Sequence, residues 1–414
     1  MSSWSLKQAK YRGKGQGVEP NQGKHVPRLL VLMKGNSAGG LKGDLFPTVA
    51  EMLKHEEFDS EVVIVGECKS STAVGMLYSI QRALWLILIC APTVPFSLLP
   101  FIFRRRHFLF EINNAIAKNG PPDLCLALSS CNDAGFTACV MHAVWNVRYV
   151  VWEHQTGYQR GKLSWHGKGM RRVTMKRAAR AMAVSHELAD AIRGSLGCAD
   201  LTIQIMPNPI PARFMVPLSE RTAGKGTHPV EELFTFGSWT RWRNIKRLDV
   251  LLEAFDMIRA KGIPARLKIA GPPQAAVSEA CKSIQHIASV EYAGIINREN
   301  MVEFVDSCDC CVIPSDHETF GLPAIEAMSR GLPVLTTISG GPESIVTSKK
   351  LGLVVAPSDA NVLADAMERI IQRRRLFNAT EIRTHCENLY GPQHIKTKWA
   401  LLVNELMAIS GSAT

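Results

Sequence analysis

From Arg28 onward, short apolar runs alternate with longer segments in which apolar residues recur at helical spacing. Short apolar runs bounded by turn residues are typical of buried strands in parallel sheets. The longer segments between them are typical of the helices that connect such strands. The alternation therefore predicts an α/β fold built from parallel, doubly wound sheets.

The apolar runs divide into two series. The first predicts strands at 29–33, 61–65, 123–128, 148–152 and 181–184, with helices such as 46–54 and 110–118 between them. A further strand-like run at 201–206 leads into a proline-rich stretch, and the polar, turn-rich segment 219–229 is the best candidate for an interdomain linker. The second series predicts strands at 233–236, 267–270, 290–292, 310–313 and 333–336 and helices at 248–261, 324–330 and 362–372.

The chain has 414 residues, which is long for one hydrophobic core, because single cores rarely grow past about 250 residues. We therefore expect two Rossmann-like domains, one at 28–218 and one at 219–390. Residues 1–27 are polar and glycine-rich and are expected to be flexible, and 391–414 is expected to form a helix that crosses back to the first domain.

Basic residues exceed acidic ones, which gives a formal net charge of +11. Such a charge favours acidic partners: nucleic acid, phosphorylated small molecules or anionic lipid. The sequence lacks the interleaved aromatic and basic motifs of the usual nucleic-acid-binding modules, so a nucleic-acid partner is not expected. For any single basic cluster, such as Lys168 to Arg180, a solvated surface is the simplest interpretation.

The cysteine pattern indicates a reducing compartment. The 11 cysteines have no regular spacing, and no signal peptide is recognisable at Met1, so a cytoplasmic location is expected. Cys308, Cys310 and Cys311 lie in an apolar run that is typical of a buried strand, and we interpret them as core residues instead of zinc ligands.

Residues 83–103 carry no charge and are about long enough to span a bilayer. Prolines at 92, 95 and 100 argue against a simple spanning helix, and the arginines at 104–106 favour contact with an anionic membrane surface. The segment 83–106 is therefore a candidate membrane-interface segment, with a spanning helix or a segment packed inside the domain as alternatives.

The most specific pattern is SDHETFGLPAIEAM at 315–328. It follows a predicted strand, and Pro323 lies where the first turn of a helix accepts proline. A helix would thus begin at the carboxyl edge of a parallel sheet, where the amides of Phe320, Gly321 and Leu322 and the helix dipole can bind an anion.

Two carboxylates, Glu318 and Glu326, flank this turn and could accept hydrogen bonds from sugar hydroxyls. The alternative is a glutamate that interacts with the helix dipole together with a solvated one.

Glu318 and Glu326, with seven residues between them, resemble the paired glutamates of retaining glycosyltransferase family 4, the glycosyl transferases group 1. Further matches are KRLDVLLEAF at 246–255, IAGP at 269–272, GLPVL at 331–335 and GGPE at 340–343. The resemblance implies a GT-B architecture, with two facing Rossmann-like domains and a cleft between them. The first domain would bind the acceptor and the second a nucleotide sugar.

The resemblance also implies roles for residues of the second domain. Glu318 would hold hydroxyls of the donor sugar, Glu326 the ribose, and the backbone of Phe320, Gly321 and Leu322 the phosphates. Lys246 would contact the donor diphosphate together with an arginine. Ser238 occupies the usual position of that arginine, so Arg241 is our choice and Arg243 the rival; an ordinary surface arginine is the alternative for both.

In the first half the resemblance is looser. Gly39 and Gly40 end a glycine-rich loop that would approach the donor, although an ordinary strand-to-helix turn explains it equally well. His154 follows a predicted strand and would point at the donor sugar, whereas a lone histidine is more often structural.

These features predict a retaining hexosyltransferase that needs no cofactor and no metal, because no Asp-x-Asp pair follows a predicted strand. The donor would be a UDP-, GDP- or ADP-sugar, and the acceptor a saccharide or a lipid-linked molecule in surface polysaccharide or glycolipid assembly at the cytoplasmic face of a membrane. The alternatives are a sugar-nucleotide 2-epimerase of the same architecture and a non-catalytic, nucleotide-binding, membrane-associated protein.

Overall fold

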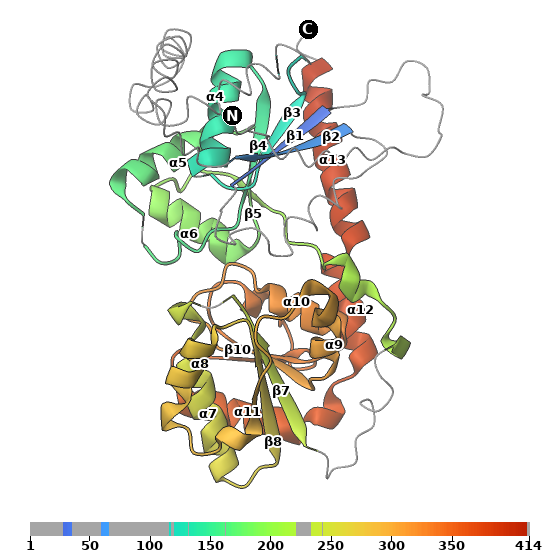
Figure 1. Ribbon diagram of the computed structural model, residues 1–414. Coiled ribbons are helices and arrows are strands. Elements are labelled where there is room, and N and C mark those ends of the chain that lie inside the picture. The colour runs from blue at the N-terminus through green and yellow to red at the C-terminus, as the bar shows by residue number, and fades with distance from the viewer. Residues whose placement is uncertain are drawn as a thin grey trace, which may run out of the picture. The chain divides into compact units, whose positions relative to one another are not determined.

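A computed structural model describes residues 28–34, 59–65, 116, 120–130, 132–161, 163–220, 233–241 and 243–411 (Figure 1). The N-terminal segment 1–27, the predicted helix 46–54, the candidate membrane segment 83–106, Gly39 and Gly40 lie outside these residues. The described chain forms two compact units. The first comprises the described residues of Met1–Val184, Ala189–Met206 and Lys396–Thr414, and the second those of Ser185–Leu188 and Pro207–Ile395.

The first unit contains a six-stranded parallel sheet in the order β2-β1-β3-β4-β5-β6. Its strands are β1 (Arg28–Lys34), β2 (Asp59–Val65), β3 (Leu124–Ala127), β4 (Arg148–Glu153), β5 (Arg180–Ala183) and β6 (Ile203–Ile205). Its helices include α4 (Asn132–Trp145), α5 (Trp165–Arg177) and α6 (His186–Leu196). Strand β4 is buried almost throughout, as expected for an inner strand of a parallel sheet.

The C-terminal helix α13 (Pro392–Gly411) contributes most of its length to the first unit. Trp399 packs against Trp152 of β4 with ring centroids 5.4 Å apart, and Arg180 forms an ion pair with Glu405. Across the ranges that the structure describes, no helix combines the length and the apolar character needed to cross a bilayer.

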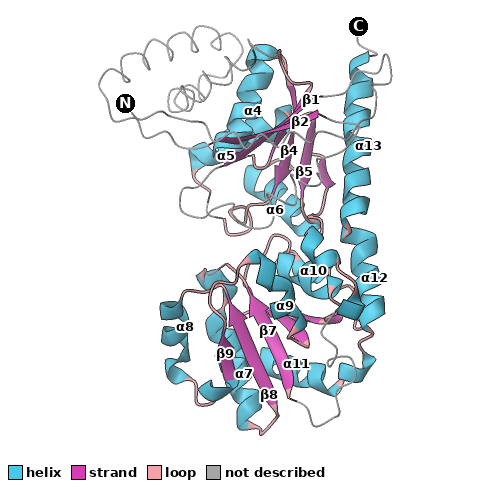
Figure 2. Ribbon diagram, turned by 45° about the vertical axis from the view of Figure 1, so that its right-hand side comes forward, coloured by secondary structure: helices cyan, strands magenta, loops and turns pink. Residues whose placement is uncertain are grey.

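The second unit contains a six-stranded parallel sheet in the order β12-β11-β10-β7-β8-β9. Figure 2 shows β7, β8 and β9 side by side. The strands are β7 (Phe234–Trp239), β8 (Ala265–Ala270), β9 (Val290–Tyr292), β10 (Cys310–Ile313), β11 (Val334–Thr337) and β12 (Gly352–Val355). The helices are α7 (Leu248–Ala260), α8 (Gln274–Ala280), α9 (Met301–Asp306), α10 (Leu322–Ser329), α11 (Ala360–Gln372) and α12 (Ala379–Tyr390). Both sheets confirm the predicted α/β, doubly wound class.

The order of the second sheet reverses between two neighbouring strands. The chain runs outward from β7 through β8 to β9, and then returns to pair β10 with the other side of β7. In open parallel sheets, the loops that follow the two strands at such a reversal separate and leave a crevice at the carboxyl edge. The loops after β7 and β10 carry the candidate residues of the second half of the sequence.

The core of the second unit lies largely between the sheet and the helices α7 and α11. Leu252, Phe255 and Ile258 of α7 are fully buried, as are Met367 and Ile370 of α11. Burial of each such side chain stabilises the fold by about 1.5–3 kcal/mol relative to exposure. The predicted core role of Cys308, Cys310 and Cys311 is confirmed by their burial, which raises the pKa of the Cys310 and Cys311 thiols.

The boundary between the units differs from the predicted one. The main continuous part of the second unit begins at Pro207, whereas the sequence suggested a boundary at 218/219. The reason is a pair of arginine side chains. Arg330, at the end of α10, and Arg383, in α12, each donate a hydrogen bond of 2.6 Å to the carbonyl oxygen of Val216. This segment, with the 3-10 helix η2 (Ala212–Met215), therefore packs as part of the second unit.

Candidate functional site

The site begins with an ion pair between the two loops at the sheet reversal. Lys246 ends the short 3-10 helix η4 (Asn244–Lys246) after β7, and Glu318 lies in the loop after β10. The Lys246 ammonium contacts the Glu318 carboxylate, and the two side chains are only 12% and 15% exposed. A partly buried pair of this kind is less screened by solvent than a surface pair. A phosphate oxygen near Lys246 would compete with Glu318 for the ammonium group.

A second set of polar contacts holds the same two loops together. The amide of Asp316 donates to the carbonyl oxygen of Ile245 at 2.9 Å. Arg247, whose φ of 49° is in the left-handed region, donates to Asp316 at 3.2 Å and also to Asp249 and Ser358. These contacts fix the distance between the loops independently of Lys246 and Glu318.

The turn into α10 leaves no room for a Cβ atom at Gly321 or at Gly341. Gly321 precedes the helix with a φ of 94°, and a Cβ atom there would lie 2.7 Å from Cγ of Pro342. A Cβ atom on Gly341 would lie 2.6 Å from the amide nitrogen of Phe320. Pro323 occupies the first turn, as predicted. The backbone from Phe320 to Leu322 is thus held at the N-terminus of α10, where the helix dipole favours a negative charge.

The loop that presses on this turn is itself held by a carboxylate. Glu343 accepts hydrogen bonds from the amides of Ser339, Gly340 and Gly341, at 3.2, 2.7 and 3.0 Å. The amide of Glu318 in turn donates to the carbonyl oxygen of Ser339 at 2.8 Å. The position of Glu318 therefore depends on the loop between β11 and β12 as well as on its own loop after β10.

Glu326 lies inside α10 and is 3% exposed. Its Oε2 accepts a hydrogen bond of 2.7 Å from the indole N–H of Trp239, the last residue of β7. Its Oε1 lies 3.6 Å from Nη2 of Arg213, in η2. Neither Glu318 nor Glu326 is a solvated surface carboxylate. The alternative interpretation, in which one of the two glutamates is solvated, is therefore wrong.

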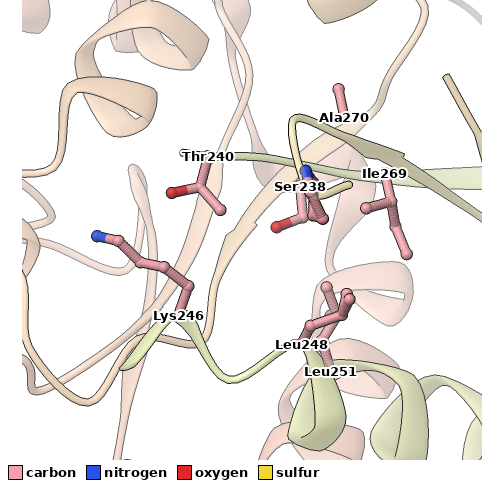
Figure 3. Close-up of a pocket in the computed structure, with 8 residues that line it drawn as sticks. Ser238, Thr240, Lys246, Leu248, Leu251, Ile269 and Ala270 are labelled. Atoms are coloured by element: carbon pink, nitrogen blue, oxygen red, sulfur yellow. The ribbon is translucent and has the colours of Figure 1, made fainter. Parts of the chain in front are cut away.

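A small cavity adjoins Lys246. It is lined by Ser238, Thr240, Lys246, Leu248, Leu251, Ile269, Ala270 and Pro272. In Figure 3 the Lys246 side chain extends away from Leu248 and Leu251, and its ammonium group lies on the same side as the hydroxyl of Thr240. The cavity therefore combines a cation and two hydroxyls with an apolar wall. Arg241 and Arg243 are exposed on the same loop.

Gly271 lies in the chain between Ala270 and Pro272, which both line this cavity. Its φ is 99°, and a Cβ atom there would lie 2.1 Å from the carbonyl oxygen of Thr240. We expect Gly271→Ala to lower the free energy of unfolding by about 1–3 kcal/mol, measured by urea denaturation, because both backbone strain and the clash must be relieved. Gly262→Ala is a matched control, with a φ of 76° and no neighbouring atom within 4 Å. Equal losses in the two variants would contradict the clash.

In the first unit, the sequence drew attention to His154. The residue before it, Glu153, accepts several hydrogen bonds. This carboxylate is fully buried at the end of β4 and accepts from the amides of Ser130, His154 and Gln155, at 2.8, 3.0 and 3.1 Å. The hydroxyls of Ser130 and Tyr158 also bond to it. Burial, and next the Glu153 carboxylate, raise the pKa of Tyr158, which keeps its hydroxyl protonated as a donor.

His154 itself is held on both sides of its ring. Its Nδ1 lies 3.0 Å from the carbonyl oxygen of Trp152, so Nδ1 carries the proton and donates. The ring packs on the indole of Trp152 with centroids 4.6 Å apart. These contacts fix the orientation of the imidazole ring at the end of β4.

Of the predicted residues, the structure joins Lys246 with Glu318, brings Phe320, Gly321 and Leu322 to the start of α10, and places Glu326 inside the same helix. Reasoning from the sequence missed Trp239, Glu153, Glu343 and the Arg247–Asp316 pair. Glu153 did carry a signal, since a carboxylate directly after a continuous apolar run is unusual. Nothing in the sequence pointed to Trp239.

Comparison with known proteins agrees with this geometry. Residues 224–387 match the family model described as glycosyl transferases group 1. D-inositol 3-phosphate glycosyltransferase from Corynebacterium urealyticum is 31% identical over 181 residues, which is 41% of each protein. Sucrose-phosphate synthase from Zea mays is 36% identical over 87 residues, 20% of this chain and 8% of that protein. The chain thus spans less than half the length of these curated relatives.

Solved structures resemble the chain over most of its length. Sucrose-phosphate synthase from Thermosynechococcus elongatus has a TM-score of 0.69 at 17% identity and covers 92% of this chain and 100% of its own. The Anabaena protein HepE, solved in complex with UDP-glucose, has a TM-score of 0.68 at 15% identity, with coverages of 91% and 99%. At this identity the likeness shows the fold, which is the GT-B fold. The second unit therefore matches the glycosyl transferases group 1 family model over most of its length, and the chain shares its fold with these solved structures.

Proposed function

We propose that the chain is a retaining glycosyltransferase that moves a hexosyl group from a nucleoside diphosphate sugar to an acceptor, without a metal ion. The observation that carries the proposal is the Lys246–Glu318 ion pair at the sheet reversal, next to the N-terminus of α10. A cation, a helix start and a carboxylate at one sheet edge suit a ligand with phosphates and hydroxyls.

In this proposal Lys246 and the N-terminus of α10 stabilise the charge that develops on the departing diphosphate. Arg241 is the proposed second cation and Arg243 its rival; both are exposed on the loop after β7 and could reach a ligand there. Fixed cations and amides that are already oriented act without reorganisation as the sugar–phosphate bond breaks. The acceptor hydroxyl attacks C1 on the face from which the diphosphate leaves, which retains the anomeric configuration, and passes its proton to the departing phosphate oxygen.

Glu318 and His154 are proposed to bind the donor sugar, and Glu326 its ribose. Glu318 can exchange its contact with Lys246 for sugar hydroxyls when a phosphate takes over the ammonium group. The donor-binding roles of Phe320, Gly321 and Leu322 rest on their backbone at the start of α10. Gly39 and Gly40, which lie outside the described residues, are retained as proposed donor contacts.

The acceptor is proposed to be a saccharide or a lipid-linked molecule used in surface polysaccharide or glycolipid assembly, with the protein peripheral at the cytoplasmic face of a membrane. The support is the net charge of +11 and the uncharged 83–103 segment beside three arginines. Co-sedimentation with vesicles of anionic and of neutral lipid tests this part separately from catalysis.

Incubation with a panel of UDP-, GDP- and ADP-sugars, with and without EDTA, tests the activity. We expect one nucleotide series to release nucleoside diphosphate, with the rate unchanged by EDTA, and nuclear magnetic resonance to show the donor's anomeric configuration in the product. Inversion, loss of activity in EDTA, or an epimerised nucleotide sugar as product would each contradict the proposal.

A further inference from the structure

Helix α5 carries more positive charge than its place in the fold requires. Its 13 residues include five lysines and arginines and no acidic residue. The helix packs beside α4 in the first unit, and its buried side chains include Met170, Thr174 and Met175. These residues account for the contact of the helix with the fold. They do not account for the cations on its exposed face.

Four exposed residues of α5 form one stripe. Ser164 caps the helix by accepting a hydrogen bond from the amide of Gly167 at 3.2 Å, so the helix begins at Trp165. An α-helix repeats about every 3.6 residues, so exposed residues three or four positions apart lie on one side of it. The residues at this spacing, which we call the α5 stripe, are Trp165, Lys168, Arg172 and Lys176.

The cations of the α5 stripe are arranged at a cost to the helix. Lys168, Arg172 and Lys176 are each four residues apart, a spacing at which like charges destabilise a helix. Asp200 offsets part of the charge, since its carboxylate lies 3.1 Å from the Lys176 ammonium group. That hydrogen bond, together with the charge of Arg172, lowers the pKa of Asp200 although this carboxyl is exposed. The stripe therefore presents net positive charge to its surroundings.

Trp165 distinguishes the α5 stripe from an ordinary solvated surface. Its side chain is 80% exposed, whereas tryptophan is highly buried on average. Solvation explains exposed cations, but it does not explain an exposed indole, because apolar surface gains free energy by leaving water. A tryptophan beside lysines and arginines is typical of helices in a membrane interface, where the ring lies at headgroup level and the cations meet anionic lipid.

We infer that the α5 stripe is the surface through which the protein docks on an anionic membrane. This inference rests on the peripheral membrane location in the proposed function, and it names the described residues that make the contact. Lys168, Arg172 and Lys176 bind lipid phosphates, and Trp165 places its ring among the headgroups. A nucleic acid would also complement the charge, but surfaces that bind single strands carry several stacking rings, and this stripe has one.

Co-sedimentation with lipid vesicles tests the inference. The vesicles consist of phosphatidylcholine alone or of phosphatidylcholine and phosphatidylglycerol in equal parts. The wild type is expected to bind the mixed vesicles and to lose affinity as salt is added, because salt screens the contact. Each basic residue near an anionic surface contributes about 5-fold in affinity, so Lys168→Gln with Arg172→Gln and Lys176→Gln should lower the affinity about 100-fold.

Three further variants separate docking by α5 from a general effect of charge. Arg373→Gln with Arg374→Gln and Arg375→Gln removes the same charge from the second unit, and its affinity should stay within about 3-fold of wild type. Asp200→Asn should bind about 5-fold more tightly, a gain that misfolding cannot produce. Trp165→Ala should bind up to about 10-fold more weakly and should lose the part of the fluorescence that brominated lipid quenches.

Equal affinity of the Lys168, Arg172 and Lys176 triple variant and the wild type overturns the inference and assigns the membrane contact to another part of the chain. A triple variant that loses affinity for single-stranded RNA but not for the mixed vesicles also overturns it. Release of nucleoside diphosphate, measured without vesicles, keeps the proposed activity separate. A wild type that releases nucleoside diphosphate but binds no vesicles contradicts the docking surface and leaves the transferase proposal standing.

Discussion

Replacing Lys246 by alanine is expected to lower kcat by about 10²–10³-fold, the range observed when one preorganised group that stabilises developing charge is removed from an active site. The side chain is 12% exposed and contacts Glu318, so its loss removes the cation next to the start of α10 and leaves a partly buried carboxylate without that partner. Steady-state release of nucleoside diphosphate from the preferred donor measures the effect.

Lys268→Ala is the matched control for this variant. Lys268 is also a partly buried lysine of the second unit, 16% exposed, and pairs with Glu291 at 3.4 Å on neighbouring strands. Its loss should leave kcat within about 3-fold, since an ion pair of this type contributes only about 0–1 kcal/mol to the stability of the fold. Comparable losses of kcat in both variants would mean that Lys246 supports the fold and has no special part in the reaction.

The largest expected effect on stability comes from Arg330. This residue is fully buried, and its guanidinium bonds to both carboxylate oxygens of Asp306 at 2.8 Å and to the carbonyl oxygen of Val216 at 2.6 Å. Arg330→Ala should lower the free energy of unfolding by about 3–5 kcal/mol, because it leaves the buried Asp306 carboxylate uncompensated. Urea denaturation followed by circular dichroism measures the loss.

Arg383→Ala gives the comparison. Arg383 donates to the same carbonyl oxygen of Val216, but its side chain is 15% exposed and its partner Glu387 is 32% exposed. Its loss should cost about 1 kcal/mol. In the double variant Arg330→Met with Asp306→Leu, part of the stability should return, because both charges are gone. A double variant less stable than Arg330→Ala would contradict an uncompensated charge as the cause.

The apolar runs of the sequence predicted most strands of the second sheet to within a few residues. Three of them, β7, β10 and β11, are buried throughout, as expected for inner strands of a parallel sheet. Strand β12 was missed. It lies at the sheet edge, and Val354 and Val355 are only half-buried, so its apolar run is shorter and less distinct. Helix α12 was also missed, although Ile382, Cys386 and Tyr390 recur at helical spacing behind the cap residue Asn378. That signal was present in the sequence.

The site was predictable only in part, for a topological reason. Residues close to one another in sequence, such as Phe320, Gly321 and Glu326, could be assigned to one loop and helix from their own pattern. The bonds from Lys246 to Glu318 and from Trp239 to Glu326 join positions 72 and 87 residues apart. They exist because β7 pairs with β10, and the sequence pattern does not specify this strand order. Trp239 could not be recognised without it.

The most direct test of the central claim, a nucleoside diphosphate site in the second unit, is thermal unfolding of the whole chain in the presence of UDP, GDP, ADP and their sugars. A ligand that binds only the folded state at 100 times its Kd adds about 2.7 kcal/mol to stability. We predict that one nucleotide series raises the Tm of the wild type without added metal, and that Glu326→Ala and Lys246→Ala abolish the rise while Lys268→Ala keeps it. No shift with any nucleotide, or an equal shift in all variants, would contradict the claim.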